Sequence, residues 1–291
     1  MSQIRSAEAI KQLILGKANT DNRIRAVLLN GSRANDNIKP DRYQDFDLVF
    51  IVNELETFTA DHSWTDCFGE IALWQLPGEM TLDDESHPDS FTYLMVFSDW
   101  HRIDLTLFPK NKLAESFEYD SLTKVWLDKD NLFNDIPRAG DSDYLIRKPS
   151  EKEFLDICNE FWWVSPYVAK AIMREEIIHA KEIMDIPVRK MFNRLIEIYV
   201  GVETNFSVSA GKGLKFIQKY IQTSEYEKIL QTYPNQKSGE IIRGQKMMMD
   251  LFSRFAKTIA HSLNYPYNLK EESNAINYFD AMLDQEPGES K

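Results

Sequence analysis

The sequence has little cysteine, little histidine and no long apolar run, and each shortage excludes a class of protein. Its 291 residues include only Cys67 and Cys158, which lie far apart without metal-type spacing, so we expect two reduced thiols in a cytoplasmic protein. The five histidines form no ligand-like cluster, so zinc is not expected. No run of about 18 apolar residues occurs, and the N-terminus lacks the apolar stretch of a secretion signal. We therefore expect no membrane partner.

The sequence also lacks a basic surplus. Its net charge is −12, which argues against binding to a nucleic-acid backbone. Residues 1–149 hold 26 acidic and 16 basic side chains, whereas residues 150–291 hold 20 and 18. Acid concentrated in the first half favours a cationic substrate there, and the alternative is that it only keeps the protein soluble.

What the sequence does contain is enough apolar surface for a folded core, with 43% hydrophobic and 12% aromatic residues. The first half alternates helix-like and strand-like segments. Two of the predicted strands, 91–97 and 103–108, are separated by a short polar turn and form a predicted hairpin. The full set of predicted strands is 24–29, 45–52, 70–76, 91–97, 103–108 and 124–127.

The pattern changes near residue 149. Ser150 followed by Glu153 has the spacing of a capping box, and Pro149 precedes it. Helical periodicity then dominates, and the predicted helices are 151–174, 175–203, 211–221, 240–265 and 272–284. We therefore predict an α/β domain at 1–148 and a helical bundle at 149–291, with a ligand cleft between them.

A glycine and a hydroxyl stand where the first predicted strand ends, in Gly31-Ser32-Arg33. Glycine lets the backbone approach a phosphate closely, and Ser32 and Arg33 could add a hydroxyl donor and a charge. The alternative is an ordinary turn. This segment is a candidate triphosphate contact.

Three aspartates are candidate metal ligands. Asp45 and Asp47 leave the same face of a strand, where their mutual repulsion is best compensated by a divalent cation. Asp104 is flanked by apolar residues in a later strand, so its charge needs a partner. A Mg²⁺ ion shared with Asp45 and Asp47 would supply one. The alternatives are a solvated strand edge for the pair, and for Asp104 an ion pair with Arg102 or a bond to a backbone amide.

Together these elements resemble the signature of the nucleotidyltransferase superfamily: Gly-Ser, Asp-x-Asp thirteen residues after the serine, and a third aspartate on a later strand. Seven stretches along most of the chain are more specific, and they resemble the aminoglycoside 6-adenylyltransferases, also called streptomycin adenylyltransferases. They are Leu-Asn-Gly-Ser-Arg (29–33), Gln-Asp-Phe-Asp (44–47), Ile-Asp-Leu-Thr-Leu (103–107), Leu-Asp-Lys-Asp (127–130), Asn-Glu-Phe-Trp-Trp-Val (159–164), Tyr-Val-Ala-Lys (167–170) and Phe-Ser-Val-Ser-Ala-Gly-Lys (206–212).

The resemblance implies an α+β fold, with a mixed sheet of the nucleotidyltransferase type flanked by helices and a C-terminal helical bundle. It also implies transfer of AMP from ATP to an aminoglycoside hydroxyl, with the 6-hydroxyl of streptomycin as the expected acceptor. Pyrophosphate would be released, two Mg²⁺ ions would take part, and the reaction would confer antibiotic resistance. Asp45 and Asp47 would bind metal, and Asp104 would be a ligand or the general base. Lys212 is a further candidate for the triphosphate, and an ordinary solvated lysine is the alternative. We expect a monomer.

For the acceptor, the resemblance implies a polycation held by carboxylates and aromatic faces. Glu160 and Trp163 share one face of a predicted helix and are the candidates, while Trp162 points elsewhere. Packing is the alternative role for either tryptophan. The loop carboxylates Glu79, Asp83, Asp84 and Glu85 could attract a cationic drug or be merely solvated. Two other functions stay open, namely transfer to a protein hydroxyl or another small molecule, and a silent nucleotide-binding protein.

Overall fold

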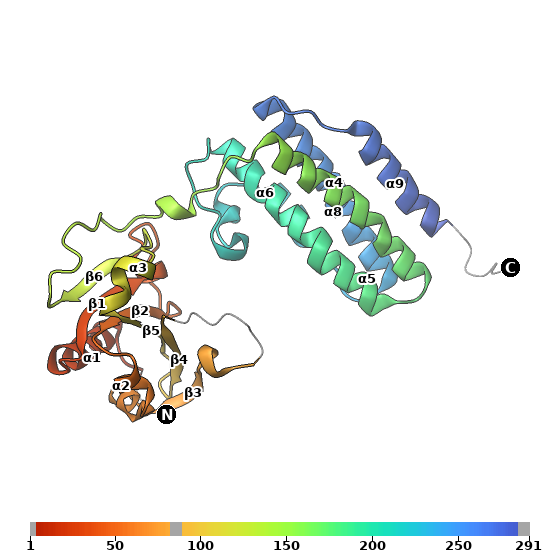
Figure 1. The fold of residues 1–291 in the computed structure, drawn as a ribbon. Helices are drawn as coiled ribbons and strands as arrows, with labels where there is room; N and C mark the ends of the chain where they lie inside the picture. The colour runs from red at the N-terminus through yellow and green to blue at the C-terminus, as the bar shows by residue number, and fades with distance from the viewer. Residues whose placement is uncertain (1–3, 82–88, 285–291) are drawn as a thin grey trace. The chain divides into compact units, whose positions relative to one another are not determined.

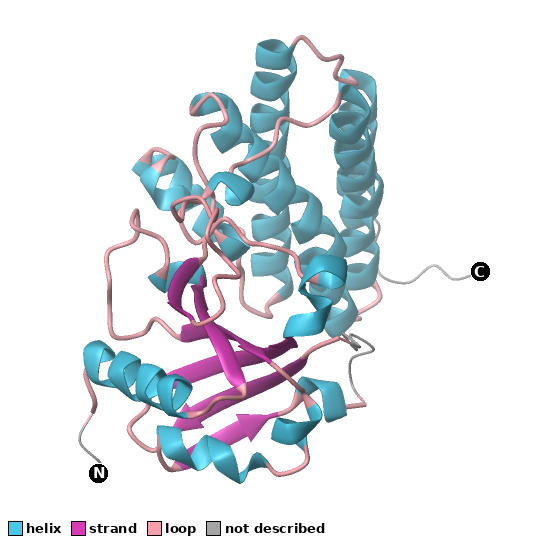
Figure 2. Cartoon of the chain, turned by 60° about the vertical axis from the view of Figure 1, so that its left-hand side comes forward, coloured by secondary structure: helices cyan, strands magenta, loops and turns pink. Residues whose placement is uncertain are grey.

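The computed structural model describes residues 4–81 and 89–284, and it divides the chain into two compact units, Met1–Asp143 and Tyr144–Lys291. Figure 1 labels their elements, and Figure 2 draws the strands of the first unit in magenta. In the described residues no helix is both long enough and apolar enough to cross a membrane.

The first unit is a mixed six-stranded sheet with the order β3-β4-β5-β2-β1-β6. All six predicted strands and the predicted hairpin between β4 and β5 are confirmed. Only β2 and β5 pair in parallel, and every other neighbouring pair is antiparallel. The strands are β1 (Ile24–Asn30), β2 (Phe46–Val52), β3 (Ile71–Gln75), β4 (Phe91–Phe97), β5 (Arg102–Pro109) and β6 (Lys124–Asp128).

Alternation along the central strands gives the sheet two apolar faces. On β2, Phe46, Leu48 and Phe50 face one core, which the helix α1 (Ala7–Thr20) covers. Val49 and Ile51 face a smaller core on the other side of the sheet. Asp47 therefore belongs to the second face, at the end where its apolar side chains stop. The two other helices of this unit are short, α2 (Glu56–Thr59) and α3 (Leu113–Ser116).

The described part of the second unit is helical. The N-cap half of the predicted capping box is confirmed, because the Ser150 Oγ accepts a hydrogen bond from the Glu153 backbone N–H at 3.1 Å. The Glu153 carboxylate pairs with Arg194 instead of closing the box. Helix α4 packs against α5, α8 and α9, and α6 packs against α8. The helices are α4 (Glu151–Met173), α5 (Ile177–Ile183), α6 (Arg189–Glu203), α7 (Thr223–Gln231), α8 (Ser238–Leu263) and α9 (Leu269–Leu283).

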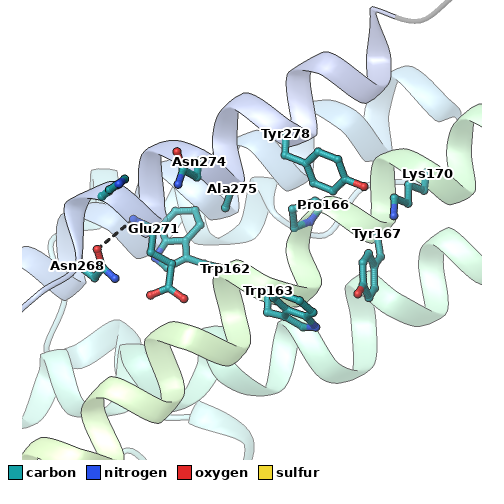
Figure 3. A pocket seen from close by; sticks show the side chains of 11 residues that line it. Trp162, Trp163, Pro166, Tyr167, Lys170, Asn268, Glu271, Asn274, Ala275 and Tyr278 are labelled. Atoms are coloured by element: carbon teal, nitrogen blue, oxygen red, sulfur yellow. Dashed lines mark hydrogen bonds between the residues drawn. The ribbon is translucent and has the colours of Figure 1, made fainter.

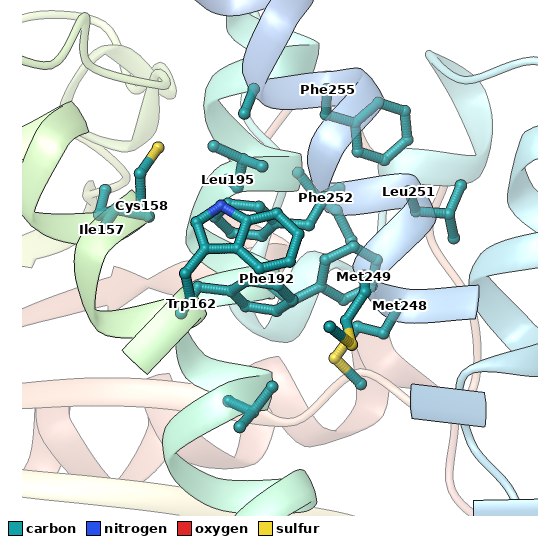
Figure 4. Close-up of a cluster of buried hydrophobic side chains, with 14 of the residues drawn as sticks. Ile157, Cys158, Trp162, Phe192, Leu195, Met248, Met249, Leu251, Phe252 and Phe255 are labelled. Atoms are coloured by element: carbon teal, nitrogen blue, oxygen red, sulfur yellow. The ribbon is translucent and has the colours of Figure 1, made fainter. Parts of the chain in front are cut away.

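The core of this unit is built from large aromatic and sulfur-containing side chains of α4, α6 and α8 (Figure 4). Trp162 is 2% exposed, and its indole N–H donates to the Tyr267 hydroxyl at 3.0 Å. The expectation that one of the two neighbouring tryptophans is core is thus confirmed. Trp162 fixes the face of α4 that is buried, which turns Trp163 toward solvent.

One helix prediction in this unit was wrong, and another is confirmed except for a π-helical turn within it. The predicted helix 211–221 is a pair of short 3₁₀ turns, Lys212–Leu214 and Ile217–Lys219. Gly211 has φ +71°, and a Cβ there would lie 2.6 Å from the Phe216 ring, so the chain folds back instead of continuing as a helix. The predicted helix 175–203 is interrupted by a π-helical turn at Met184–Val188, which contains Pro187.

Candidate active site

The parallel pairing of β2 with β5 brings the predicted carboxylates together. Asp47 lies directly opposite Asp104 in the register, and both belong to the same face of the sheet. Asp45 stands immediately before the first residue of β2. The sheet therefore gathers at one place three aspartates that come from two strands distant in sequence.

The Gly31 backbone lies so close to the Asp47 carboxylate that a glycine is needed at this position. It has φ +68°, in the left-handed region, and a Cβ at this position would lie 2.4 Å from the Asp47 Oδ2. Asn30, the last residue of β1, pairs with Asp47 in the antiparallel register. The Gly31–Arg33 turn thus begins beside the carboxylate, and only glycine leaves room for it.

Asp104 is held by the ion pair that the sequence left open as an alternative. The Arg102 Nε donates to Asp104 Oδ1 at 2.6 Å, and its Nη2 donates to Oδ2 at 2.8 Å. The same Nε lies 3.9 Å from Asp45 Oδ2. A fork-to-fork pair of this kind is among the stronger charge-assisted contacts, so Arg102 partly neutralises the cluster.

The surroundings of Asp47 oppose its ionisation. Burial raises its pKa to about 6, and the charges of Asp104 and Asp45 act in the same direction. Burial also raises the pKa of Asp45. Repulsion among partly buried carboxylates is relieved by a cation, and oxygen ligands of this kind suit Mg²⁺.

The cluster fits a divalent cation in its chemistry, while both carboxylate oxygens of Asp104 accept hydrogen bonds from Arg102. Within residues 4–81 and 89–284, no three acidic, histidine or cysteine side chains converge as a metal site in their present positions. Asp45 and Asp47 keep carboxylate oxygens available.

Arg33 has a structural position in this arrangement. Its Nε donates to the Asp45 carbonyl at 2.9 Å and its Nη2 to the Gln44 carbonyl at 2.5 Å. Its guanidinium lies 4.0 Å from the centre of the Phe46 ring, and burial lowers its pKa. The Gln44 amide in turn donates to the Ser32 carbonyl at 3.2 Å. These bonds tie the Gly31–Arg33 turn to the segment that carries Asp45 and Asp47.

Comparison with known proteins assigns the chain to a family. A family model described as streptomycin adenylyltransferase matches residues 4–282. The chain belongs to this family. As a member, it is an adenylyltransferase, and the resemblance inferred from the sequence motifs is confirmed.

Two curated relatives support the assignment over nearly the whole chain. An aminoglycoside 6-adenylyltransferase of Campylobacter jejuni is 39% identical over 269 residues, which cover 92% of this chain and 93% of the relative. One from Staphylococcus aureus is 36% identical, with 91% and 94% covered. The crystal structure of an aminoglycoside 6-adenyltransferase from Bacillus subtilis is 30% identical, covers 97% of this chain and 100% of that chain, and has a TM-score of 0.47.

The candidate acceptor residues of this adenylyltransferase lie in the helical unit. Trp163 is 65% exposed and lines a groove of about 640 Å³ between α4 and α9 (Figure 3). Glu160 is also exposed on α4, but it lines a different hollow with Glu153 and Asp156. The expected shared solvent-facing side of α4 is therefore present, although its two candidates lie in separate hollows.

The groove beside Trp163 contains residues that sequence reasoning did not select. Tyr167 and Lys170 follow Trp163 at helical spacing, which is the signal that could have found them. The Lys170 ammonium lies 5.1 Å from the ring centres of both Tyr167 and Tyr278. Tyr278 and Glu271 come from α9, and local periodicity does not reveal which helix packs across from α4.

The remaining candidates have simple surroundings. Lys212 is exposed and begins a 3₁₀ turn, so the expectation that it stands at the start of an α-helix was wrong. Glu79 is 55% exposed, and its Oε1 lies 3.8 Å from the His62 Nε2. The other loop carboxylates, Asp83, Asp84 and Glu85, lie outside the described residues.

Proposed function

We propose that this adenylyltransferase transfers AMP from ATP to a hydroxyl group of an aminoglycoside, and that streptomycin, at its 6-hydroxyl, is the preferred acceptor. The observation that carries the proposal is the Asp47–Asp104 pair beside Gly31, in a chain whose relatives are named aminoglycoside 6-adenylyltransferases. The acceptor oxygen forms a bond to the α-phosphorus, and the bond from that phosphorus to the oxygen of the β-phosphate breaks, releasing pyrophosphate.

In this proposal the carboxylates hold two Mg²⁺ ions, with Asp45 and Asp47 as ligands. Bound Mg²⁺ neutralises phosphate charge and polarises the reacting phosphorus. Asp104 lies opposite Asp47, where it serves as a further ligand or takes the proton of the attacking hydroxyl. The backbone turn at Gly31 and the Ser32 hydroxyl face the triphosphate.

The proposal gives the two basic candidates different parts. Arg33 acts chiefly through the carbonyls of Gln44 and Asp45, which it fixes, and adds positive charge near the phosphates. Lys212 is exposed and contacts the triphosphate directly. Placing the reactants in line matters most in this chemistry, because the protein forms no covalent bond to the substrate in this proposal.

For the acceptor, the helical unit offers negative charge and an aromatic face. Glu160 lies in a hollow with Glu153 and Asp156, which pair with Arg194 and Lys152. The carboxylate of Glu160 itself suits the guanidinium and amino groups of an aminoglycoside. Trp163 presents its exposed ring for a cation or a sugar face. The acidic surplus of the chain assists the encounter with a polycation.

The test is pyrophosphate release from ATP and Mg²⁺ by the purified protein, with streptomycin, kanamycin, spectinomycin or no drug. We expect release with streptomycin and an adenylylated product whose modified hydroxyl is located by NMR. An Asp47→Asn protein is the matched control and should release none. Release with a different acceptor would correct the substrate, and ATP binding without release for any acceptor would contradict the transferase proposal.

A further inference from the structure

The carboxylate cluster of the first unit carries more negative charge than the fold neutralises. Asp45, Asp47 and Asp104 are three acids, and in the described part of the chain Arg102 is the one side-chain cation that forms an ion pair with any of them. Arg33 is near, but its guanidinium hydrogen bonds go to backbone carbonyls. The cluster therefore depends on a single arginine while no other cation is bound.

Arg102 is well placed to be displaced. It is the first residue of β5 and shares a face with Asp104 two residues later. Its side chain is 41% exposed, whereas that of Asp104 is 22% exposed. Because water can solvate the guanidinium when it leaves, releasing Asp104 does not strand a buried charge.

We propose that Arg102 is a built-in counter-ion that holds the carboxylate cluster together until a divalent cation replaces it at Asp104. In this role it is a positioning residue, which acts through Asp104 and contacts neither nucleotide nor acceptor. It competes with the metal ion, so it sets the concentration at which the site fills. The inference rests on the metal-binding role given to Asp47 and Asp104 in the proposed function.

Two consequences distinguish a competing counter-ion from an arginine that only stabilises the strand. Replacing Arg102 with methionine, which keeps an unbranched apolar stem but removes the guanidinium charge, should strengthen metal binding by about tenfold, equivalent to about 1.4 kcal/mol. The same change should lower the thermal stability of the metal-free protein, because the three acids then repel without compensation. Saturating Mg²⁺ should remove that difference in stability, because the ion then supplies the missing charge.

Arg25 provides a matched control in the same unit. Its Nε donates to Asp130 Oδ2 at 2.9 Å and its Nη2 bonds Oδ1, which reproduces the geometry of the Arg102–Asp104 pair away from the cluster. The Arg25→Met protein should therefore bind metal like the wild type. Any loss of stability in this variant should persist when Mg²⁺ is added.

The experiment is calorimetric titration of Mn²⁺ into wild-type, Arg102→Met and Arg25→Met proteins without nucleotide or drug, together with thermal unfolding in EDTA and in saturating Mg²⁺. Tighter Mn²⁺ binding by Arg102→Met alone, with a stability deficit that Mg²⁺ removes, supports the inference. Unchanged, weaker or undetectable Mn²⁺ binding by Arg102→Met overturns it, as does a deficit that Mg²⁺ leaves in place. Pyrophosphate release by the wild type is measured separately, so either proposal can fail without the other.

Discussion

Asp47 and Asp99 are carboxylates of the same sheet unit with opposite surroundings. The Asp99 side chain is 4% exposed and accepts hydrogen bonds from the Arg5 Nε at 2.6 Å and from the His101 ring. Burial opposes its ionisation, but these bonds outweigh burial and hold the pKa of Asp99 well below its usual range. For Asp47, burial and the neighbouring acids raise the pKa to about 6.

The difference separates a carboxylate that side chains of the fold neutralise from one that lies among other acids. Asp99 joins the N-terminal segment to the β4–β5 turn, and the fold supplies its cation. Asp47 lies against Gly31 among other acids, and in the proposed function a bound cation compensates its charge. Partners supplied by the fold favour stability, whereas uncompensated charge favours binding.

Among substitutions that test the contrast between Asp47 and Asp99, the largest expected effect is on the rate of catalysis. Asp47→Asn or Asp104→Asn should lower the rate of AMP transfer by at least about 10³-fold, because each removes a charge that the reaction needs. Circular dichroism should show an intact fold. A variant with a near wild-type rate would remove that residue from the mechanism.

Asp99→Asn should instead act on stability. We expect the free energy of unfolding at neutral pH to fall by about 2 kcal/mol, because a buried charge-assisted pair is broken. A carboxylate with a lowered folded pKa stabilises above its unfolded pKa of about 3.9 and loses that contribution as pH falls further. Urea denaturation should therefore show the gap from wild type closing below about pH 4.

The exposed Asp36, which pairs with Lys124 and Arg138, is the control for that experiment. Its side chain is 46% exposed, and Asp36→Asn should leave the urea midpoint unchanged because solvent screens such pairs. Equal loss from Asp36→Asn and Asp99→Asn would mean that burial does not distinguish the two sites.

Gly31→Ala tests the close approach that places Asp47. Its Cβ would collide with the Asp47 carboxylate at a positive φ, so we expect a loss of about 2 kcal/mol in unfolding free energy and a slower transfer rate. Gly16→Ala in α1, where nothing lies within 4 Å, should be neutral or stabilising. Thermal unfolding compares the two, and equal midpoints would contradict the packing at Gly31.

The smallest expected effect is an increase in the free energy of unfolding. In EDTA well above pH 6, Asp47→Asn should stabilise the fold by about 1 kcal/mol, less than the full pKa shift implies because the carboxylate is only partly buried. A raised folded pKa means that the folded state binds the proton more tightly, so wild-type stability improves as pH falls from 6 toward 4. The advantage of the variant should shrink over that window, and a constant advantage would contradict the shift.

Much of the fold was predictable because it depends on local patterns. Alternation along β2 and the apolar runs of the other strands placed all six, and the capping box placed the start of α4. The segment near Lys212 failed because the folding back at Gly211 depends on contact with the Phe216 ring, which helical periodicity does not encode. Helix α7 was not predicted for a similar reason, because it is short and its apolar face is recognisable only from its packing against α8.

The site was predictable in its residue types and less so in its contacts. Motif spacing selected Gly31, Asp45, Asp47 and Asp104, and the sheet gathers all four. Arg33 was expected to contact the triphosphate, and that role stays a prediction while its hydrogen bonds go to two backbone carbonyls. The groove between α4 and α9 could not be predicted in full, because half of its lining comes from a helix far along the chain.

The sequence by itself determined which side chains alternate on each strand, where the helical half begins and which family motifs are present. Only the tertiary structure decided that β5 lies parallel to β2, that Asp104 therefore stands opposite Asp47, and that Arg102 neutralises it. The physical reason is the distance along the chain over which each interaction acts. Periodicity and capping act over a few residues, whereas strand order and charge pairing depend on which distant segments bury their apolar surfaces together.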